Sequence, residues 1–316
     1  MLNKNQILKS YTCKMTWENN CVVKLNSDST ESFYCGDIVT GTVILKFKRK
    51  ENIERIDFVV CGTSKASWTR PSPTIPHIKF YSQKKKVLHI DIDLFGNIKG
   101  KPVEAGEYEY PFCFALPQDL PSSFESSIAK VEYSIKIKCT GSFKFNKTQP
   151  FVVLGNVNLN HIEKYLEPSC HEINKIFWNN GPISCLVKTY TAFSSNQSVP
   201  IEVTITNKRK IKLYKLSAFL VQKLKYTMTQ GHADEEKIVC KISKKDFQNL
   251  EKETCSLNLN IPHLIPSSIY TQDPMIGISY VLRVQLKLPF HLATLSEDIP
   301  VIVATVPVLH YDIDEF

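Results

Sequence analysis

Strict alternation of apolar and polar residues is the feature that most limits what this chain can fold into. In VEYSIKIKC (131–139), every second residue from Val131 to Cys139 is apolar, and the residues between them are polar. A period of two places apolar side chains on one face of a strand and polar side chains on the other, as in an antiparallel sheet with one wet face. The same pattern predicts strands at 42–48, 87–95, 256–261 and 280–288, and two strands within 203–220 joined by a turn at Asn207–Lys210.

Helical spacing is nearly absent from the sequence. We expect at most a helical turn or two around Asp246–Leu250, inside the charged segment 234–253. Many short strands separated by Gly, Pro, Asn and Ser clusters are typical of β-sandwiches. The fold class that we predict is therefore all-β.

A repeated phrase indicates that the unit is built twice. LPQDLPSSF (116–124) and IPHLIPSSI (261–269) share apolar-Pro-x-x-apolar-Pro-Ser-Ser-apolar, and a strand with a tyrosine follows each copy: Tyr133 in the first half and Tyr280 in the second. Because proline cannot donate to a ladder, each copy ends one strand and stiffens the crossover to the next. With 316 residues, the chain can hold two sandwiches of about 150 residues each. We place the domains at 10–154 and 155–310, followed by a short tail at 311–316.

Charge and cysteine content indicate the surroundings of the protein. The net charge is +8, of which residues 1–160 carry +7, so the first half is the one expected to meet anionic groups. The first ten residues, MLNKNQILKS, contain no apolar signal core, and no apolar run reaches the length of a membrane span. We therefore expect a cytoplasmic protein whose ten cysteines are reduced and packed as small apolar side chains.

Several groups of residues resemble the arrestin family, and most closely its α-arrestin branch of arrestin-domain-containing proteins. In the first half these groups are Gly36-Asp37 with Val39, Gly41 and Val43, then Cys61-Gly62 with Ala66 and Trp68, then Gly106–Leu116 followed by Leu120–Glu125. In the second half they are Ile201–Asn207, Ile278–Val284 and Pro300–Pro307. The resemblance implies two tandem immunoglobulin-like β-sandwich domains joined by a short hinge, and a non-enzymatic adaptor without a cofactor. It also implies that the first strand region receives partner peptides by strand addition.

No constellation for bond chemistry is visible in the sequence. None of the eight histidines forms a metal-ligand pattern, and no phosphate-binding glycine loop or Gly-x-Ser-x-Gly elbow is present. Basic clusters are the remaining candidates, because ammonium and guanidinium groups bind phosphate oxygens through charge-assisted hydrogen bonds. For a phosphorylated tail or an anionic lipid headgroup we select Lys14, Lys136, Lys138, Lys48, Arg49 and Lys50.

The resemblance implies partners among membrane proteins. We expect the cytoplasmic tails of receptors or transporters to bind, with recruitment to the plasma membrane or to endosomes, endocytosis and protein transport as the outcome, and no nucleic acid. The sequence has no Pro-Pro dipeptide and hence no Pro-Pro-x-Tyr motif, so a ubiquitin ligase is expected to join only indirectly. Two alternatives stay open at this point: an arrestin-fold structural subunit of a retromer-like endosomal sorting coat, and a secreted tandem Ig-like adhesion protein.

Overall fold

The computed structural model describes residues 20–26, 32–71, 78–177, 181–271, 275–289 and 294–311. The chain divides into two compact units. Unit 1 is the chain up to Gly155, with which the short segments Tyr226–His232 and Tyr270–Ile276 are grouped, and unit 2 is the remainder from Asn156 onward.

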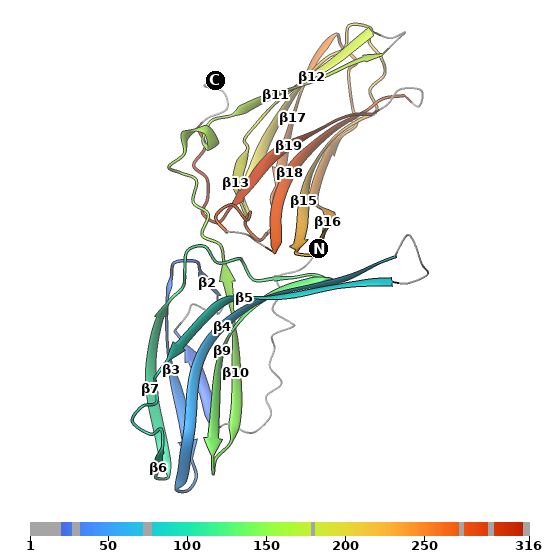
Figure 1. Ribbon diagram of the computed structural model, residues 1–316. Helices are drawn as coiled ribbons and strands as arrows, with labels where there is room; N and C mark the ends of the chain where they lie inside the picture. The colour runs from blue at the N-terminus through green and yellow to red at the C-terminus, as the bar shows by residue number, and fades with distance from the viewer. Residues whose placement is uncertain are drawn as a thin grey trace. The chain divides into compact units, whose positions relative to one another are not determined.

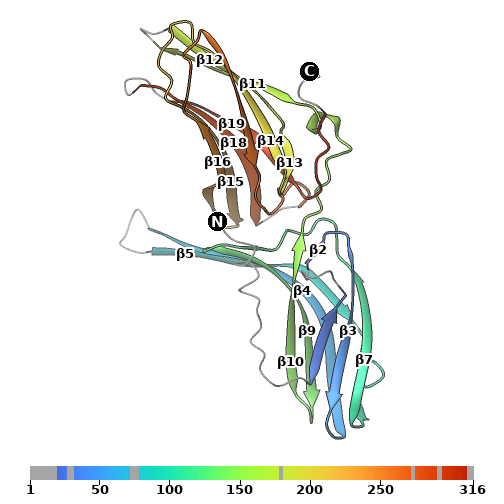
Figure 2. The same cartoon turned by 180° about the vertical axis from the view of Figure 1, so that it is seen from behind.

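Unit 1 is built from two sheets (Figure 1). The smaller sheet has the order β1-β3-β7 and contains β1 (Cys21–Leu25), β3 (Ile38–Phe47) and β7 (Gly106–Ala115). The larger sheet has the order β2-β10-β9-β4-β5, with β6 on β4 and β8 on β9. Its strands are β2 (Ser32–Tyr34), β4 (Glu51–Pro71), β5 (Ile78–Ile92), β6 (Lys101–Val103), β8 (Phe124–Glu125), β9 (Ala129–Gly141) and β10 (Phe145–Leu154). Seen from behind, β9 and β10 lie side by side and β3 and β7 belong to the facing sheet (Figure 2).

Unit 2 repeats this two-sheet plan, with one more strand in its small sheet and without counterparts of the short strands β6 and β8. A four-stranded sheet has the order β11-β12-β14-β17, and a five-stranded sheet has the order β13-β19-β18-β15-β16. The strands are β11 (Ser169–Phe177), β12 (Gly181–Thr189), β13 (Ala192–Ser194), β14 (Ser198–Thr206), β15 (Lys215–Met228), β16 (Gly231–Lys244), β17 (Lys252–Asn260), β18 (Ile276–Lys287) and β19 (Leu295–Ala304). A single 3-10 turn, η1 (Glu163–Tyr165), precedes β11, and the described part of the chain contains no α-helix.

The all-β prediction is confirmed, and so is the pair of strands within 203–220. Asn207 closes the turn between β14 and β15, because its side-chain amide donates to the carbonyl of Ile211 at 2.8 Å and its Oδ1 accepts from the Ile211 N–H at 3.0 Å. The expected helical turn around Asp246–Leu250 is wrong. The charged residues before it belong to β16, an edge strand whose many exposed side chains suit a charged sequence, and 245–250 has no regular structure.

The alternation in the sequence becomes a two-faced sheet. In β9, Tyr133, Ile135 and Ile137 are at most 1% exposed, whereas Lys136 and Lys138 between and beyond them are exposed. Tyr133 also explains the glycine of the Cys61-Gly62 pair. Its ring lies over Gly62 so closely that a Cβ there would stand 2.5 Å from a ring carbon.

The repeated Pro-Ser-Ser phrase is bound by a tyrosine in each unit, at carbonyls that differ by one position of the phrase. In unit 1, the Tyr133 hydroxyl donates to the carbonyl of Pro121 at 2.6 Å, and in unit 2 the Tyr280 hydroxyl donates to the carbonyl of Ile265 at 2.7 Å. A tyrosine on one strand thus secures the segment that carries the phrase, as the tyrosine corner does in immunoglobulin-like sandwiches. These contacts and the matching strand orders both support the prediction of two related halves.

The cysteines of the described residues are free thiols. Five of them are buried: Cys21, Cys35, Cys139, Cys185 and Cys255. Burial raises the pKa of Cys139 to about 11 and that of Cys185 to about 12, so these thiols stay protonated at neutral pH and pack as apolar side chains.

Candidate peptide-docking edge

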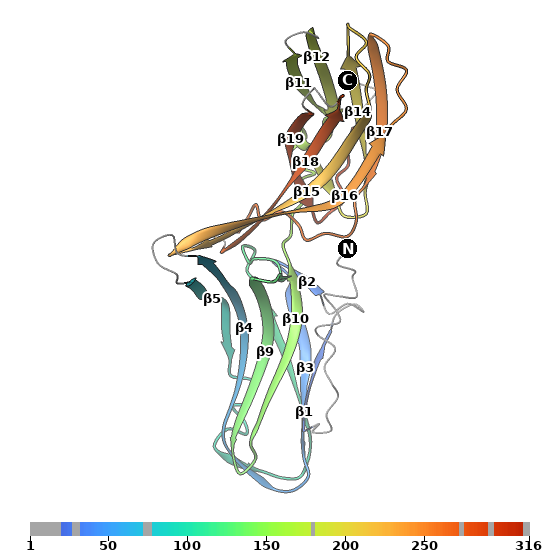
Figure 3. The same cartoon turned by 90° about the vertical axis from the view of Figure 1, so that its right-hand side faces the viewer.

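Strand β1 forms one margin of the small sheet of unit 1 (Figure 3). It pairs antiparallel with β3, with Cys21 opposite Leu45 and Leu25 opposite Gly41. Within the described ranges, no strand is bonded to its other side. An open strand edge is a template for pairing with a second chain, which makes β1 the first place to look for a docking site.

The backbone groups that β1 offers at this edge follow from two hydrogen bonds. The N–H of Lys46 donates to the carbonyl of Asn20 at 2.9 Å, and the N–H of Asn26 donates to the carbonyl of Thr40 at 2.9 Å. Even-numbered residues of β1 therefore bond to β3, because both polar groups of one residue point to the same side of an antiparallel strand. The N–H and C=O groups at the open edge are those of Cys21, Val23 and Leu25.

The residues of β1 and Gly41 of β3 explain why β1 packs at this margin. Cys21 and Val23 are buried, whereas Lys24 between Val23 and Leu25 is exposed, so the strand has one core face and one wet face. Close pairing with β3 requires a glycine at position 41. A Cβ on Gly41 would stand 2.4 Å from the carbonyl oxygen of Lys24.

Unit 2 shows the same edge already occupied. Strand β12 pairs with β14 as β1 pairs with β3, but β12 also bonds to β11 on its other side. The sequences match as well: CVVKL (21–25) in β1 and CLVKT (185–189) in β12. Cys185, the counterpart of Cys21, lies opposite Ile173 of β11. The protein therefore contains an example of the antiparallel strand that the edge of β1 can accept.

A basic side chain stands beside the open edge. Lys147 of β10 belongs to the inward-pointing set of its strand and is half-buried. Burial raises the pKa of the Cys21 thiol to about 12, and the positive charge of Lys147 lowers that pKa in part. Lys147 therefore interacts electrostatically with Cys21 of β1. No carboxylate forms an ion pair with Lys147 in the part of the chain that the structure describes. An unpaired ammonium next to an open edge favours an acidic or phosphorylated strand there.

The structure separates the basic residues selected from the sequence. Lys14 lies outside the described residues. Lys136 and Lys138 project together from the outer face of the large sheet of unit 1, opposite Thr148 and Asn146 of β10. They form no ion pair among the described residues, since the nearby Asp57 is bound by Arg55 at 2.7 Å.

The cluster Lys48–Lys50 lies elsewhere, at the turn between β3 and β4. Arg49 pairs with Glu51 at 2.9 Å and Lys50 pairs with Glu104 at 2.5 Å, which leaves Lys48 as the member without a carboxylate partner in the described structure. Glu51 and Asp57, the latter opposite Lys138, are six residues apart along β4, or about 20 Å at the usual strand rise. The two clusters are therefore separate surfaces.

Sequence reasoning did not select Lys147 or the backbone of 21–25. The signal that could have found the edge is the repeat of Cys-x-Val-Lys at 21–24 and 185–188. Lys147 carries no such signal, because its position beside β1 depends on how the two sheets face each other.

Other kinds of site find no support in the described residues. No three His, Cys, Asp or Glu side chains gather there in a way that could hold a metal ion. Among the described residues there is also no helical segment that could span a bilayer.

Comparison with known proteins shows which family the two units match. Residues 21–160 match the family model described as Arrestin (or S-antigen), N-terminal domain, and residues 180–308 match the one described as Arrestin (or S-antigen), C-terminal domain. The first match contains β1 and Lys147, and the second contains the strand β12 whose edge is filled.

Curated relatives include two that are named as arrestin domain-containing proteins. The chain is 20% identical over 307 residues to arrestin domain-containing protein 17 of Caenorhabditis elegans, covering 90% of this chain and 70% of that protein. It is 24% identical over 215 residues to human arrestin domain-containing protein 1, covering 65% of this chain and 48% of that protein. A shorter match, 29% identical over 112 residues, is to the thioredoxin-interacting protein of Sus scrofa, with 35% and 29% covered. The chain thus spans about half the length of the human relative.

Proposed function

Since the chain belongs to the arrestin family, in its arrestin-domain-containing branch, we propose that it is a non-enzymatic adaptor that binds tails of membrane proteins. The tail adds as an extended strand to the open edge of β1. Endocytosis and transport of the bound receptor or transporter are the cellular outcome, and a ubiquitin ligase joins indirectly. The protein acts in the cytoplasm and is recruited to the plasma membrane or endosomes with its cargo.

The observation that carries this proposal is the open edge of β1 beside Lys147, compared with the filled edge of β12. Three residues of β1 have N–H and C=O groups that no described strand uses, and the matching residues of β12 bond to β11. Main-chain hydrogen bonds supply affinity for any extended segment, and the ammonium of Lys147 selects for negative charge. An acidic or phosphorylated tail meets both requirements.

A binding assay with a defined probe tests the proposal. The probe is a fluorescein-labelled octapeptide in which valine alternates with phosphoserine, and the reference is the same peptide with serine. We expect the phosphorylated peptide to bind more tightly, and its affinity to fall between low and physiological salt because the contact is electrostatic. Lys147→Ala should weaken binding about tenfold, while Lys99→Ala, a change at an exposed lysine of the same unit, should leave it unchanged.

A backbone variant tests the strand-addition geometry. The N–H of Leu25 faces the open edge, so Leu25→Pro removes a docking donor without removing a bond to β3. Strand addition at β1 requires that Leu25→Pro loses binding of the phosphopeptide while its melting temperature stays unchanged. If Leu25→Pro and Lys147→Ala both bind the phosphopeptide as the parent does, β1 is not the docking edge.

A further inference from the structure

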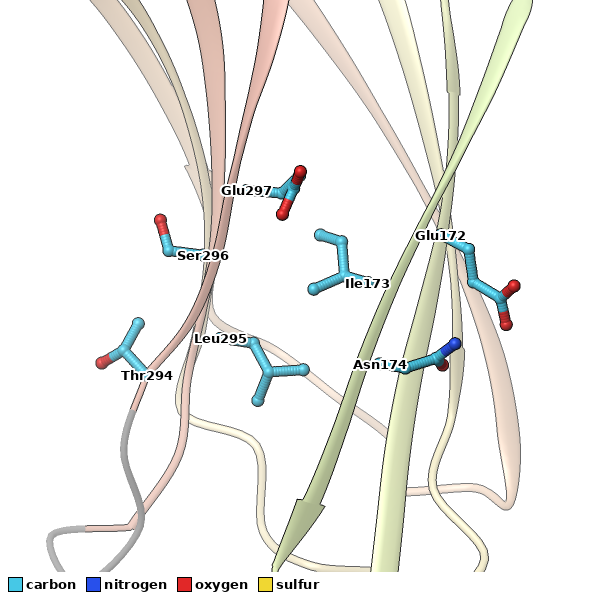
Figure 4. A pocket seen from close by; sticks show the side chains of 7 residues that line it. All are labelled: Glu172, Ile173, Asn174, Thr294, Leu295, Ser296 and Glu297. Atoms are coloured by element: carbon cyan, nitrogen blue, oxygen red, sulfur yellow. The ribbon is translucent and has the colours of Figure 1, made fainter.

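A groove in unit 2 lies between the margins of its two sheets. Its volume is about 330 Å³, and it is lined by three residues of β11, three of β19 and the residue before β19. These are Glu172, Ile173, Asn174, Thr294, Leu295, Ser296 and Glu297 (Figure 4). Ile173 and Leu295 extend into the space between the strands and form its apolar floor, since they are 8% and 2% exposed.

One wall of the groove is an edge of β19 that is open among the residues the structure describes. Strand β13 pairs with β19 only from Ile302 to Ala304. The N–H of Ile302 donates to the carbonyl of Thr191 at 2.8 Å, so even-numbered residues of β19 point their polar groups away from β18. Ser296 and Asp298 therefore offer backbone groups to the groove. Pro300 is also an even-numbered residue of β19. A proline has no N–H to donate, and at this position an N–H would not bond to β18 in any case.

The other wall is the outer edge of β11. The N–H of Ile261 donates to the carbonyl of Gln197 at 3.0 Å, so odd-numbered residues of β14 bond to β17 and even-numbered ones bond to β12. Even-numbered residues of β12 therefore bond to β14, and its odd-numbered residues bond to β11. Cys185 is one of these, so the backbone groups of its partner Ile173 point toward β12. The backbone groups left at the outer edge of β11 are those of Cys170, Glu172 and Asn174.

The groove is acidic. Glu297 belongs to the inward-pointing set of β19, yet it is exposed, and its carboxylate extends toward the gap (Figure 4). No lysine, arginine or histidine is among the lining residues. Burial lowers the pKa of the His171 imidazole in β11, and the negative charge of Glu297 raises that pKa in part. An extended segment with a cation facing inward would complete this site.

The charge of the groove is opposite to that beside β1. Val152 of β10 pairs in parallel with β2 as Ile302 of β19 pairs with β13. Five residues before each stand Lys147 and Glu297, which are therefore counterparts in the two units. The same position of the fold carries a cation beside one open edge and an anion beside the other.

From these observations we propose that the groove between β11 and β19 is a second docking site, for an extended segment of a partner protein with a basic residue two positions from an apolar one. The segment adds to the outer edge of β11, its apolar side chain covers Ile173 and Leu295, and its lysine or arginine pairs with Glu297. The site is independent of the β1 edge and has the opposite charge preference. One adaptor can therefore hold an acidic tail and a basic segment at the same time.

The experiment uses the full chain and two labelled nonapeptides in which valine at the odd positions alternates with threonine, the central valine being replaced by arginine in one and by glutamate in the other. The parent should prefer the arginine peptide, and Glu297→Lys should weaken that peptide about tenfold and favour the glutamate peptide instead. Glu251→Lys, the same charge change at an exposed position of unit 2, should leave the preference intact. Leu25→Pro should have no effect on the arginine peptide, which separates this site from the β1 edge.

Backbone variants decide between strand addition and simple charge attraction. Asn174→Pro removes an N–H from the outer edge of β11 without breaking a backbone bond to β12. Ser296→Pro removes one from β19 without breaking a backbone bond to β18, although it also removes the hydroxyl that accepts from Gln285 at 3.3 Å. Asn174→Pro should weaken the arginine peptide about tenfold, and an unchanged melting temperature shows that the unit still folds. The proposal is overturned if the two peptides bind the parent equally, if Glu297→Lys behaves like Glu251→Lys, or if both proline variants bind as the parent does.

Discussion

Ser123 and Val153 hydrogen-bond to each other twice: the Ser123 N–H donates to the Val153 carbonyl at 2.7 Å, and the Val153 N–H donates to the Ser123 hydroxyl at 3.0 Å. Ser267 and Val303 form an equivalent pair in unit 2, at 2.9 and 3.0 Å, although Ser267 is the first serine of its copy of the phrase and Ser123 is the second. Both valines are fully buried. The serine hydroxyl therefore satisfies an N–H group that water cannot reach, which gives the repeated Pro-Ser-Ser phrase its structural role.

Removing either hydroxyl should destabilise its unit. Ser123→Ala and Ser267→Ala each leave a buried valine N–H without an acceptor, at a cost of about 1–3 kcal/mol in the free energy of unfolding. Denaturant titration followed by tryptophan fluorescence and circular dichroism measures the loss. Ser82→Ala, a change at an exposed serine of β5, is the matched control and should lie within about 0.5 kcal/mol of the parent.

This device also shows what the sequence can predict. The period of two in 131–139 places Tyr133 and Ile135 in the core correctly, and the Pro-Ser-Ser repeat identifies two related halves. Both signals are local and depend only on strand geometry and proline chemistry. The phrase does not reveal which serine bonds to the last strand, because that depends on how the crossover packs.

The candidate site could be predicted only in part. The family resemblance directs attention to the first strand, and the repeated Cys-x-Val-Lys at 21–24 and 185–188 could have supported it. Lys147 and Glu297 carry no sequence signal, because their position at a sheet margin follows from where β2 and β13 stop pairing. The clusters at 48–50 and 136–138 look alike in sequence, but the ion partners Glu51 and Glu104 distinguish them in the structure.

An ion-pair network in unit 2 should make the free energy of unfolding depend on pH in the acid range. Arg283 binds Asp298 through two nitrogens, at 2.6 and 2.8 Å, and Lys223 adds a third contact at 3.1 Å. The hydrogen bonds from Arg283 hold the pKa of Asp298 at about 2. Because the folded pKa lies below the unfolded one, the stabilisation is present above about pH 4 and is lost as the pH falls toward 2. Asp298→Asn should be less stable than the parent at pH 7, with the difference vanishing by about pH 2 in urea titrations.

His310 should add a second pH dependence, nearer neutrality. Its ring stacks on Tyr190 with centroids 3.8 Å apart, and its Nε2 lies 2.7 Å from the carbonyl of Ala192. Burial lowers the pKa of His310, so the neutral ring is favoured in the folded state and stability falls as the pH drops below the unfolded value of about 6.5. His310→Gln should reduce the decline in melting temperature between about pH 7.5 and 5.5. His161→Gln, at an exposed position, should keep the full decline.

Lys136 and Lys138 are expected to bind anionic headgroups, as clustered lysines do at about 1 kcal/mol each near a charged bilayer. The double variant Lys136→Ala/Lys138→Ala should lower partitioning to phosphatidylserine-containing vesicles about tenfold or more, with no effect on neutral vesicles. Co-sedimentation at low salt measures this. The control is Lys99→Ala/Lys101→Ala, two exposed lysines of the same unit; equal losses in both double variants would show that only net charge matters.

Amide hydrogen exchange on the complex with the phosphoserine octapeptide shows whether the peptide adds to β1 as a strand. We predict new protection at Cys21, Val23 and Leu25, whose N–H groups face the open edge, and no change at Val22 and Lys24, whose N–H groups already bond to β3. A bound peptide that leaves Cys21, Val23 and Leu25 exchanging as in the free protein would contradict it.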